Sequence, residues 1–563
     1  MDRQQVAEAF EEMADLLEFR GEEPFKVRAY RRGAEAVRRS PEELAVLRGE
    51  GRLHELPGIG KALEEKIGEL LDRGTFRALE ELKRSVPAGM EELLAVPGLG
   101  PKTAARLYRE LGIKDRAGLA AALEQKRLRD LPGMGERREQ QLREALAARE
   151  RLTSRHPLSE TLPLAEALVE EVRRLPGVRQ VAVAGSIRRF RDTTGDIDLV
   201  AEAADPEAVG RAFAASGRVS RVLALGEVRA RVVLAEGIQA DLWAVAPGGF
   251  PAALHHATGS KNHSVRLRSL ARQLGLTLNE YGIFRGEESL AVRSEEDIYR
   301  HLGLPFIPPE LREDSGEIEA ALAGELPELL NPADILGDLH VHTDWSDGQR
   351  SVDEMAAAAR ELGYRYLAIC DHSRSLGVAH GLDGERLARQ REEIAAVNAA
   401  HPEFRLLAGV EVDIRMDGSL DLPDAVLAQL DFVTASIHAG LGADRTIQTR
   451  RLVRAMENPH VDAIGHPTGR LLGRREPYEL DLEEVVAAAA RTGTALELNA
   501  QLSRLDLSTE HLRLARERGV QVVVNSDAHG VEGLRNMAFG VRSARRGWLG
   551  RAQVRNARPW TAG

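Results

Sequence analysis

Residues 185–198 read Gly-Ser-Ile-Arg-Arg-Phe-Arg-Asp-Thr-Thr-Gly-Asp-Ile-Asp, and they place two carboxylates at alternate positions of a predicted strand. Side chains two residues apart on a β-strand point to the same face, so we expect Asp196 and Asp198 to project together. Carboxylates this close repel by about 4 kcal/mol at an effective dielectric constant near 20, unless cations lie between them. Magnesium that also bridges to substrate phosphates is the expected solution. The stretch therefore predicts a site for phosphate chemistry on a sheet.

The flanking sequence supplies a third carboxylate and groups that bind phosphate. Asp241 lies in Gln-Ala-Asp-Leu-Trp, residues 239–243, on a predicted neighbouring strand. Three such carboxylates can hold two metal ions, one activating a 3′-hydroxyl and one neutralising a triphosphate and its leaving pyrophosphate. Gly185 lets the backbone approach a phosphate, and Ser186 and Arg189 supply donors to it. We expect Mg²⁺, or Mn²⁺, in this site.

The segments around these motifs alternate between β-rich runs and polar turns from about residue 178 onward. The predicted strands cover residues 181–184, 197–200, 229–234 and 238–245. Residues 248–312 then mix helix with short strands. This pattern predicts a sheet-containing α+β region.

The motifs of this region resemble the palm signature of X-family DNA polymerases, the group typified by DNA polymerase beta. The resemblance implies that Asp196, Asp198 and Asp241 hold the catalytic metals, the third also serving as base or shield for the primer hydroxyl. It also implies that phosphates of the incoming nucleotide contact Ser186, Arg189 and Gly195. Thr258-Gly259-Ser260 and Asn279-Glu280-Tyr281 resemble the thumb motifs that close over the nascent pair, so Gly259 and Asn279 are further candidate nucleotide contacts.

Two adjacent positions depart from this family pattern. His256 and Ala257 stand where the family often has two aromatic residues that crowd the sugar. The resemblance therefore does not extend to the residues that select deoxyribonucleotides over ribonucleotides.

Three copies of one turn punctuate the helical pattern of the first 150 or so residues: 56–60, 96–100 and 131–135, each Pro-Gly-apolar-Gly leading into a helix. Such a turn exposes backbone N–H groups at a helix N-terminus, where a phosphate oxygen can bind and position a duplex without reading its bases. One copy alone is more often a tight helix connection, but three copies favour phosphate binding. The turns resemble helix-hairpin-helix motifs of DNA repair proteins. The candidate DNA contacts are Gly58, Gly60, Lys61, Gly98, Gly100 and Lys102.

The first of these turns leads toward a candidate catalytic lysine. The N-terminal segment resembles the small lyase domain of X-family polymerases, in which Lys66 matches the lysine that forms a Schiff base with a baseless sugar. Several accompanying basic residues of that pattern are missing, and a solvated helix residue is the alternative interpretation.

The second half of the chain places histidines and carboxylates at the ends of predicted strands. Runs such as 366–369, 432–435 and 522–524 alternate with helices such as 351–362, which predicts a parallel sheet or barrel with its chemistry at the carboxyl ends of the strands. His340 and His342 at one strand end direct both imidazoles to one side. Six histidines with Asp347, Glu411 and Asp527 are simplest to explain as a metal cluster of two or three ions. Imidazole and carboxylate ligands suit zinc, manganese or iron.

This half resembles the polymerase-and-histidinol-phosphatase (PHP) superfamily, whose trinuclear site lies in a distorted βα barrel. The resemblance implies an active phosphodiesterase with Zn²⁺ or Mn²⁺, acting as a 3′→5′ exonuclease, a 3′-phosphatase or an abasic-site endonuclease. The family pattern matches His340, His342, Asp347, His372, Glu411, His438, His466, Asp527 and His529. Arg470 and Arg474, just past His466, are candidate contacts to the DNA backbone, with a solvated loop as the alternative.

Composition limits the class of protein. The formal net charge of −11 argues against one continuous basic surface, so we expect nucleic-acid contacts to be local patches. Cys370 is the only cysteine, which excludes an intrachain disulfide and fits a reducing compartment. No apolar run reaches membrane-spanning length, and the N-terminus lacks the features of a signal peptide. We expect a cytoplasmic monomer.

The expected architecture is multidomain. It comprises helical N-terminal helix-hairpin-helix domains over 1–82 and 83–152, a palm over 153–246, a thumb over 247–314, a linker over 315–334 and a distorted (β/α) barrel over 335–563. The predicted function is repair synthesis from dNTPs on gapped or nicked DNA, with the barrel cleaning 3′ ends. The alternatives are a template-independent or RNA-directed nucleotidyltransferase, a scaffold that holds DNA ends with structural metals, and a small-molecule phosphatase in the second half.

Overall fold

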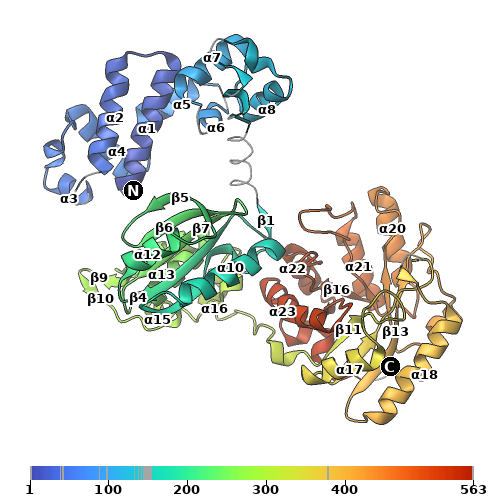
Figure 1. Cartoon of the computed structure of the whole chain (residues 1–563). Helices are drawn as coiled ribbons and strands as arrows, with labels where there is room; N and C mark the ends of the chain where they lie inside the picture. The colour runs from blue at the N-terminus through green and yellow to red at the C-terminus, as the bar shows by residue number, and fades with distance from the viewer. Residues whose placement is uncertain are drawn as a thin grey trace. The chain divides into compact units, whose positions relative to one another are not determined.

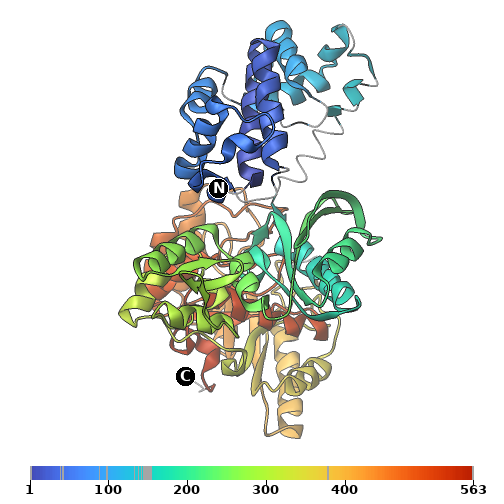
Figure 2. The ribbon, with the colours of Figure 1, turned by 90° about the vertical axis from the view of Figure 1, so that its left-hand side faces the viewer.

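The structure is a computed structural model that describes residues 3–560, apart from 39, 41–43, 88, 95, 97–98, 132–133, 137, 141, 144–154 and 377–378. The chain forms two compact units, Met1–Ser154 and Arg155–Gly563 (Figures 1 and 2). Among the described residues, no helix is both long and apolar enough to cross a membrane.

The first unit is helical throughout its described residues, as expected from the sequence. One core surrounds Phe10, Ile67 and Phe76, and a second surrounds Leu93 and Leu107. The helices are α1 (Arg3–Arg20), α2 (Pro24–Arg38), α3 (Leu44–Gly49), α4 (Lys61–Arg73), α5 (Arg77–Arg84), α6 (Met90–Leu94), α7 (Pro101–Leu111) and α8 (Arg116–Glu124).

The second unit begins with the palm sheet, which has five strands in the order β2-β4-β7-β6-β5. Strands β4 and β7 are parallel, and every other pair is antiparallel. All four predicted strands are present, as β2 (Val178–Val183), β4 (Asp196–Ala203), β6 (Arg229–Leu234) and β7 (Gln239–Val245). The edge strand β5 (Val219–Leu225) was not predicted; most of its side chains are exposed, so it lacks the alternation of a half-buried strand. Around the sheet lie β1 (His156–Pro157), α10 (Leu158–Arg173), α11 (Gly185–Arg188), β3 (Thr193–Thr194) and α12 (Pro206–Ala214).

The thumb combines helices with one small antiparallel sheet. It contains α13 (Phe250–Thr258), α14 (Lys261–Gln273), β8 (Thr277–Asn279), β9 (Gly282–Arg285), β10 (Glu288–Ser289) and α15 (Glu295–His301). The expected linker over 315–334 is not a free connection. Within it, α16 (Glu317–Ala323) buries Ile318 in the thumb core, and Glu317 pairs with the imidazole of His263 at 2.6 Å. Part of the predicted linker therefore packs against the thumb.

The barrel of the second half has seven parallel strands in sequential order, β11 to β17. They are β11 (Gly337–Val341), β12 (Tyr366–Ile369), β13 (Arg405–Asp413), β14 (Phe432–Ser436), β15 (Ala463–Ile464), β16 (Ala495–Asn499) and β17 (Val522–Asn525). The helices are α17 (Val352–Glu361), α18 (Gly384–Ala400), α19 (Asp424–Leu427), α20 (Arg445–Met456), α21 (Leu482–Thr492), α22 (Thr509–Glu517) and α23 (Met537–Arg546). The predicted βα alternation is confirmed.

The first and last strands of the barrel meet without a regular ladder. Their backbones share one isolated bridge, between Val341 and Ala528. Side chains complete the seam, because Asn525 Oδ1 accepts from the backbone N–H of Leu339 at 3.1 Å and the Asp338 carboxylate accepts from that of Ser526. The barrel is therefore nearly closed.

Candidate active sites

The three palm carboxylates lie on one face of the sheet. Asp196 and Asp198 alternate along β4, and the parallel register sets Asp198 opposite Asp241 of β7. Burial, followed by the charges of Asp196 and Asp241, raises the pKa of Asp198 to about 8. Burial and the charge of Asp241 also raise the pKa of Asp196. Mutual repulsion of this kind requires the carboxylates to converge, and a shared divalent cation would relieve it. The residues present fit a magnesium or manganese site.

Two arginines of β6 that the sequence analysis did not select neutralise the third carboxylate. Arg229 donates to Asp241 Oδ2, and Arg231 Nε lies 3.2 Å from Asp241 Oδ1. Gln239 Nε2 adds a third donor at 3.3 Å. The signal that could have found these arginines is their i, i+2 spacing on a predicted strand, which places both on one face.

The glycine-serine turn lies directly against the sheet face that carries the three carboxylates. Gly185 has a φ of +57°, and a Cβ built on it would lie 2.0 Å from Asp198 Oδ2. The Ser186 Oγ is buried and has no hydrogen-bond partner among the described residues. A buried hydroxyl without a partner is costly, so it indicates a ligand that completes it. Gly195 has open space around its Cα, with nothing within 4 Å of a built Cβ.

The palm and thumb candidates meet at Arg189. Its Nε donates to Glu313 at 3.0 Å, and its guanidinium also donates to the carbonyl oxygen of Thr258. A Cβ on Gly259 would lie 3.2 Å from Arg189 Nη1, so the structure brings these two predicted residues together. Asn279 lies at the end of β8, where its Oδ1 accepts from the backbone N–H of Tyr281 at 3.0 Å.

All nine predicted ligands of the barrel gather at the carboxyl ends of its strands. Three groups have ligand atoms within 4.8 Å of one another: His342, Asp347, His372 and His529; His340, His342 and Asp527; and His372, Glu411 and His438. The ninth, His466, has its Nε2 2.9 Å from Glu411 Oε1. Shared members join the groups into one cluster that fits two or three ions.

Charge and burial in this cluster suit metal binding. Burial, followed by the neighbouring imidazoles, lowers the pKa of His342 to about 3, so this ring is neutral and can donate a lone pair. At His372, burial lowers the pKa of the imidazole, but the negative charge of Glu411 outweighs burial and raises the pKa to about 10. Among the described residues, the Nε2 atoms of His340 and His342 make no hydrogen bond, although Glu411 and Asp527 oxygens lie 3.5 Å and 3.1 Å away respectively. Lone pairs and carboxylates that converge in this way fit a shared ion.

Two acids that pair with histidines of the cluster were not predicted from the sequence. Glu497 of β16 accepts from His340 Nδ1 at 2.7 Å and from the backbone N–H of His466 at 2.6 Å. Asp413 lies 2.6 Å from His438 Nδ1. Each pairs one ring nitrogen and so turns the other toward the cluster. The available signals were the i, i+2 spacing of Glu411 and Asp413, and the single acid in the apolar strand Ala-Leu-Glu-Leu.

Described residues at the ends of the three Pro-Gly-apolar-Gly turns make the same backbone hydrogen bond in each copy. The backbone N–H groups of Ile59, Leu99 and Met134 each donate across their turn at 3.0 Å, to the carbonyls of Leu56, Val96 and Leu131. Gly60 and Gly100 are the N-caps of α4 and α7 and have extended backbone. The Gly58 φ is +89°, and Gly98 lies outside the described residues.

The predicted cations of the first unit differ in their surroundings. Lys61 is exposed at the start of α4. Lys102 is 85% exposed, with its Nζ 3.7 Å from Glu18 Oε1. Lys66 is half-buried, and its Nζ donates to the Ala62 carbonyl of its own helix at 3.0 Å.

The two arginines after His466 lie in different environments. Arg474 is exposed. Arg470 is only 11% exposed, forms a 2.9 Å ion pair with Asp192 of the palm and donates to the Arg504 carbonyl at 2.9 Å. Its donors are therefore engaged within the protein, and its contact to the DNA backbone stays a prediction.

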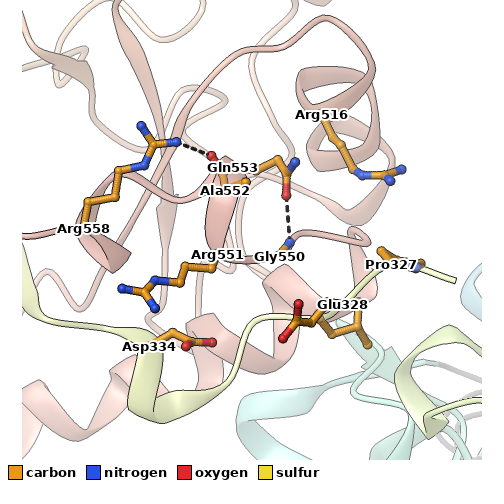
Figure 3. A pocket seen from close by; sticks show the side chains of 10 residues that line it. Pro327, Glu328, Asp334, Arg516, Gly550, Arg551, Ala552, Gln553 and Arg558 are labelled. Atoms are coloured by element: carbon orange, nitrogen blue, oxygen red, sulfur yellow. Dashed lines mark hydrogen bonds between the residues drawn. The ribbon is translucent and has the colours of Figure 1, made fainter.

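A cleft of about 630 Å³ elsewhere in the second unit contains none of the predicted site residues (Figure 3). It lies between the segment around Glu328 and Asp334 and a turn that carries Arg551 and Arg558. Arg558 donates to the Ala552 carbonyl at 2.6 Å. Charges of both signs line it, so it does not form a simple anion site.

Comparison with known proteins matches the chain in four parts and along its whole length. Family models match a helix-hairpin-helix domain (1–76), a SAM-like helix-hairpin-helix tandem (90–148), the DNA polymerase beta thumb (253–313) and the PHP domain (338–501). The DNA polymerase/3′-5′ exonuclease PolX of Bacillus subtilis strain 168 is 41% identical over 562 residues, covering 99% of this chain and 98% of the relative.

Other relatives match about a third of the chain. A probable phosphatase of Thermoanaerobacter sp. strain X514 is 34% identical over 204 residues, which cover 34% of this chain and 78% of the relative. A probable phosphatase of Acetivibrio thermocellus is 33% identical over 201 residues, again 34% of this chain and 78% of the relative. With the full-length match and the palm and barrel sites described above, these findings show that the chain belongs to the bacterial X-family DNA polymerases that carry a C-terminal PHP domain.

Proposed function

We propose that this enzyme is a DNA-directed DNA polymerase that fills gaps during repair, and that its PHP domain processes the 3′ ends from which synthesis starts. The observation that carries the polymerase assignment is the in-register pair Asp198 and Asp241 beside Asp196, against the Gly185 turn. The B. subtilis relative bears both activities in its name, and its similarity spans the whole chain.

In the palm, each group has a role that follows from its position. Two Mg²⁺ or Mn²⁺ ions held by Asp196, Asp198 and Asp241 would supply charge neutralisation and an acidified primer hydroxyl. The free Ser186 hydroxyl and the Arg189 guanidinium bind phosphate oxygens of the incoming dNTP. Gly185 and Gly195 leave room for that approach, while Gly259 and Asn279 border the nucleotide from the thumb.

In the barrel, the nine ligands hold two or three ions, with Zn²⁺ or Mn²⁺ as the expected metals. These ions would supply a hydroxide nucleophile and neutralise the phosphate and the leaving oxygen. Glu497 and Asp413 keep His340 and His438 oriented by accepting from their Nδ1 atoms. The substrates are a 3′-terminal phosphodiester, a 3′-terminal phosphate or an abasic site.

The three glycine-rich turns of the first unit bind the phosphates of gapped or nicked DNA, with Lys61 and Lys102 beside them and Arg474 exposed on the barrel loop. Lys66 is the candidate for a lyase step at a baseless sugar. We place the domain boundaries near residues 82, 152, 246, 314 and 334, and the enzyme acts as a cytoplasmic monomer.

An activity panel on chelated protein, with each metal added back, tests this proposal. Primer extension on gapped DNA with Mg²⁺, and 3′-end processing with Zn²⁺ or Mn²⁺, are the expected results. Extension of RNA ends instead of gapped primers would identify a different nucleotidyltransferase. Hydrolysis of a small phosphate monoester but not of 3′-phosphorylated DNA would favour a small-molecule phosphatase, and no turnover at all would favour a scaffold.

A further inference from the structure

Helix α23 of the PHP half reaches the nucleotide-binding turn of the palm. Arg542 Nη2 donates to the Arg188 carbonyl at 2.9 Å, and Arg546 Nη1 donates to the Arg189 carbonyl at 2.7 Å. These two carbonyls end α11, the turn that begins with Gly185. Cationic donors at the C-terminal carbonyls satisfy groups that the helix itself leaves open. In Figure 1, α23 lies between the palm and the barrel strands.

The same helix holds the residue after Arg189 in a strained conformation. Phe190 is fully buried and has a φ of +57°, a conformation that costs free energy for a residue with a Cβ. Its ring stacks on Phe539 of α23 at 6.1 Å, and the Arg542 guanidinium lies 4.4 Å from its centroid. Contacts from α23 therefore fix the backbone that aims Arg189.

Arg546 also belongs to a charge cluster around one carboxylate. Glu313 accepts from Arg189 Nε at 3.0 Å, from Arg191 Nη1 at 3.2 Å and from Arg546 Nη1 at 3.1 Å. Arg546 is 6% exposed and Arg189 is 11% exposed, so solvent screens this cluster poorly. Three guanidinium groups share a single carboxylate, which leaves a net positive charge on the segment that follows Ser186. The Ser186 hydroxyl has no hydrogen-bond partner among the described residues.

We propose that Arg546 of the PHP half is a positioning residue for nucleotide addition: it holds Arg189 and shares Glu313, and thereby prepares the pocket for the triphosphate of the incoming nucleotide. This inference rests on the proposed polymerase function. Without Arg546, Glu313 pairs more tightly with Arg189 and competes with the triphosphate. The turn also loses the donor at its last carbonyl.

The barrel gives α23 a rigid base for this role. A Cβ on Gly540 would lie 2.5 Å from Val524 Cγ1 of β17 and 2.8 Å from Ala500 Cβ, so the helix packs directly on the barrel strands. Arg546 Nε is itself held, because it donates to Thr509 Oγ1 at 3.2 Å. The Arg546 guanidinium is thus held on two sides, and the barrel supplies part of the geometry of the palm.

The test compares Arg546→Ala with Arg545→Ala in the full-length protein on gapped DNA. Arg545, the adjacent residue, pairs with Glu310 at 3.1 Å and donates to the Leu330 carbonyl, so its loss removes a similar ion pair away from the turn. Arg546→Ala should raise the KM for dNTP and the Kd of dNTP on a dideoxy-terminated primer about tenfold, equivalent to one lost charged contact. Arg545→Ala should leave both constants unchanged, and both variants should keep 3′-end processing.

Two further variants separate positioning from folding. Arg546→Lys keeps the charge but loses the guanidinium that donates from Nε and Nη1 at the same time. It should therefore raise the Kd of dNTP about threefold, even if the alanine variant does not fold. Glu313→Gln combined with Arg546→Ala should raise the Kd of dNTP by less than the two single changes predict together, because both residues act on Arg189. Unchanged Kd in both Arg546 variants, or an equal rise in Arg545→Ala, would overturn the inference. A wild-type protein that extends no primer would instead overturn the proposed function.

Discussion

Gly185 and Asp198 are in direct contact: a Cβ on residue 185 would lie 2.0 Å from the Oδ2 of the carboxylate. The turn that begins at Gly185 and the strand that carries Asp198 thus form a single unit, since neither can shift without moving the other. The positive φ of residue 185 adds a second reason for glycine at this position.

Gly185→Ala should therefore abolish most primer extension while leaving 3′-end processing intact. The new methyl group displaces Asp198, and a shift of about 1 Å in a catalytic group costs on the order of 100-fold in rate. The measurement is kcat/KM for dNTP on gapped DNA. Gly217→Ala serves as the control, because nothing lies within 4 Å of a built Cβ there. Wild-type extension by Gly185→Ala would mean that the contact has no role.

The two candidate sites should be separable by single substitutions. Asp198→Ala removes a carboxylate from the palm and should abolish nucleotide addition but leave nuclease activity. His342→Ala removes a member of two ligand groups in the barrel and should do the reverse. Both activities are measured on the same preparations. Loss of both activities in Asp198→Ala would show that the sites are not independent, and retained nuclease activity in His342→Ala would remove the cluster from the mechanism.

Glu497→Gln should weaken metal binding in the barrel without removing a predicted ligand. The amide can no longer accept from both His340 and the backbone of His466 as a carboxylate does, and loss of such an orienting acid typically costs about 10- to 100-fold in metal affinity. Metal content after dialysis against a buffered chelator gives the readout. Glu479→Gln, an exposed acid of the same barrel, is the matched control. Equal metal content in the two variants would contradict the role of Glu497.

Glu295 should make the second unit sensitive to acid. Burial opposes ionisation of Glu295, but Arg312 and Arg188 outweigh it and lower the pKa from 4.5 to about 2. Because the native pKa is below the unfolded one, the stabilisation is full above pH 4.5 and is lost as the pH falls toward 2. A shift of this size corresponds to about 3 kcal/mol in the free energy of unfolding.

The measurement is urea unfolding of wild type and Glu295→Gln between pH 7 and pH 3. The variant should be less stable by about 3 kcal/mol or more at pH 7, since the fully buried Arg312 loses its partner, and the difference should shrink as the pH falls. A difference that does not change with pH would rule out the ion pair as its cause.

The sequence predicted those parts of the sites that local spacing encodes. That Asp196 and Asp198 share a face follows from the two-residue period of a strand. That the barrel ligands converge follows from the rule that the carboxyl ends of barrel strands meet at one end of the barrel. A neighbouring strand that carries Asp241 was also predicted, but the parallel pairing that sets Asp241 opposite Asp198 was not.

Contacts between distant segments could not be predicted in this way. The sequence predicts Arg470 as a loop cation, yet the residue is largely buried against Asp192 of the palm, far away in the sequence. Arg546 reads as the end of a helix, and only the packing of α23 brings it to Arg189. The segment 315–334 reads as a linker because it is short and acidic, but Glu317 is buried against His263. Such partners depend on tertiary packing, which composition and period do not encode.

The incomplete seam between β11 and β17 has a consequence for assembly. His340 and His342 come from one side of that seam, and Asp527 and His529 come from the other. An ion with ligands from both sides would therefore cross-link the first and last strands of the barrel. Metal binding should then complete the closure of the barrel, and the midpoint temperature of thermal unfolding should rise with the metal content of the enzyme.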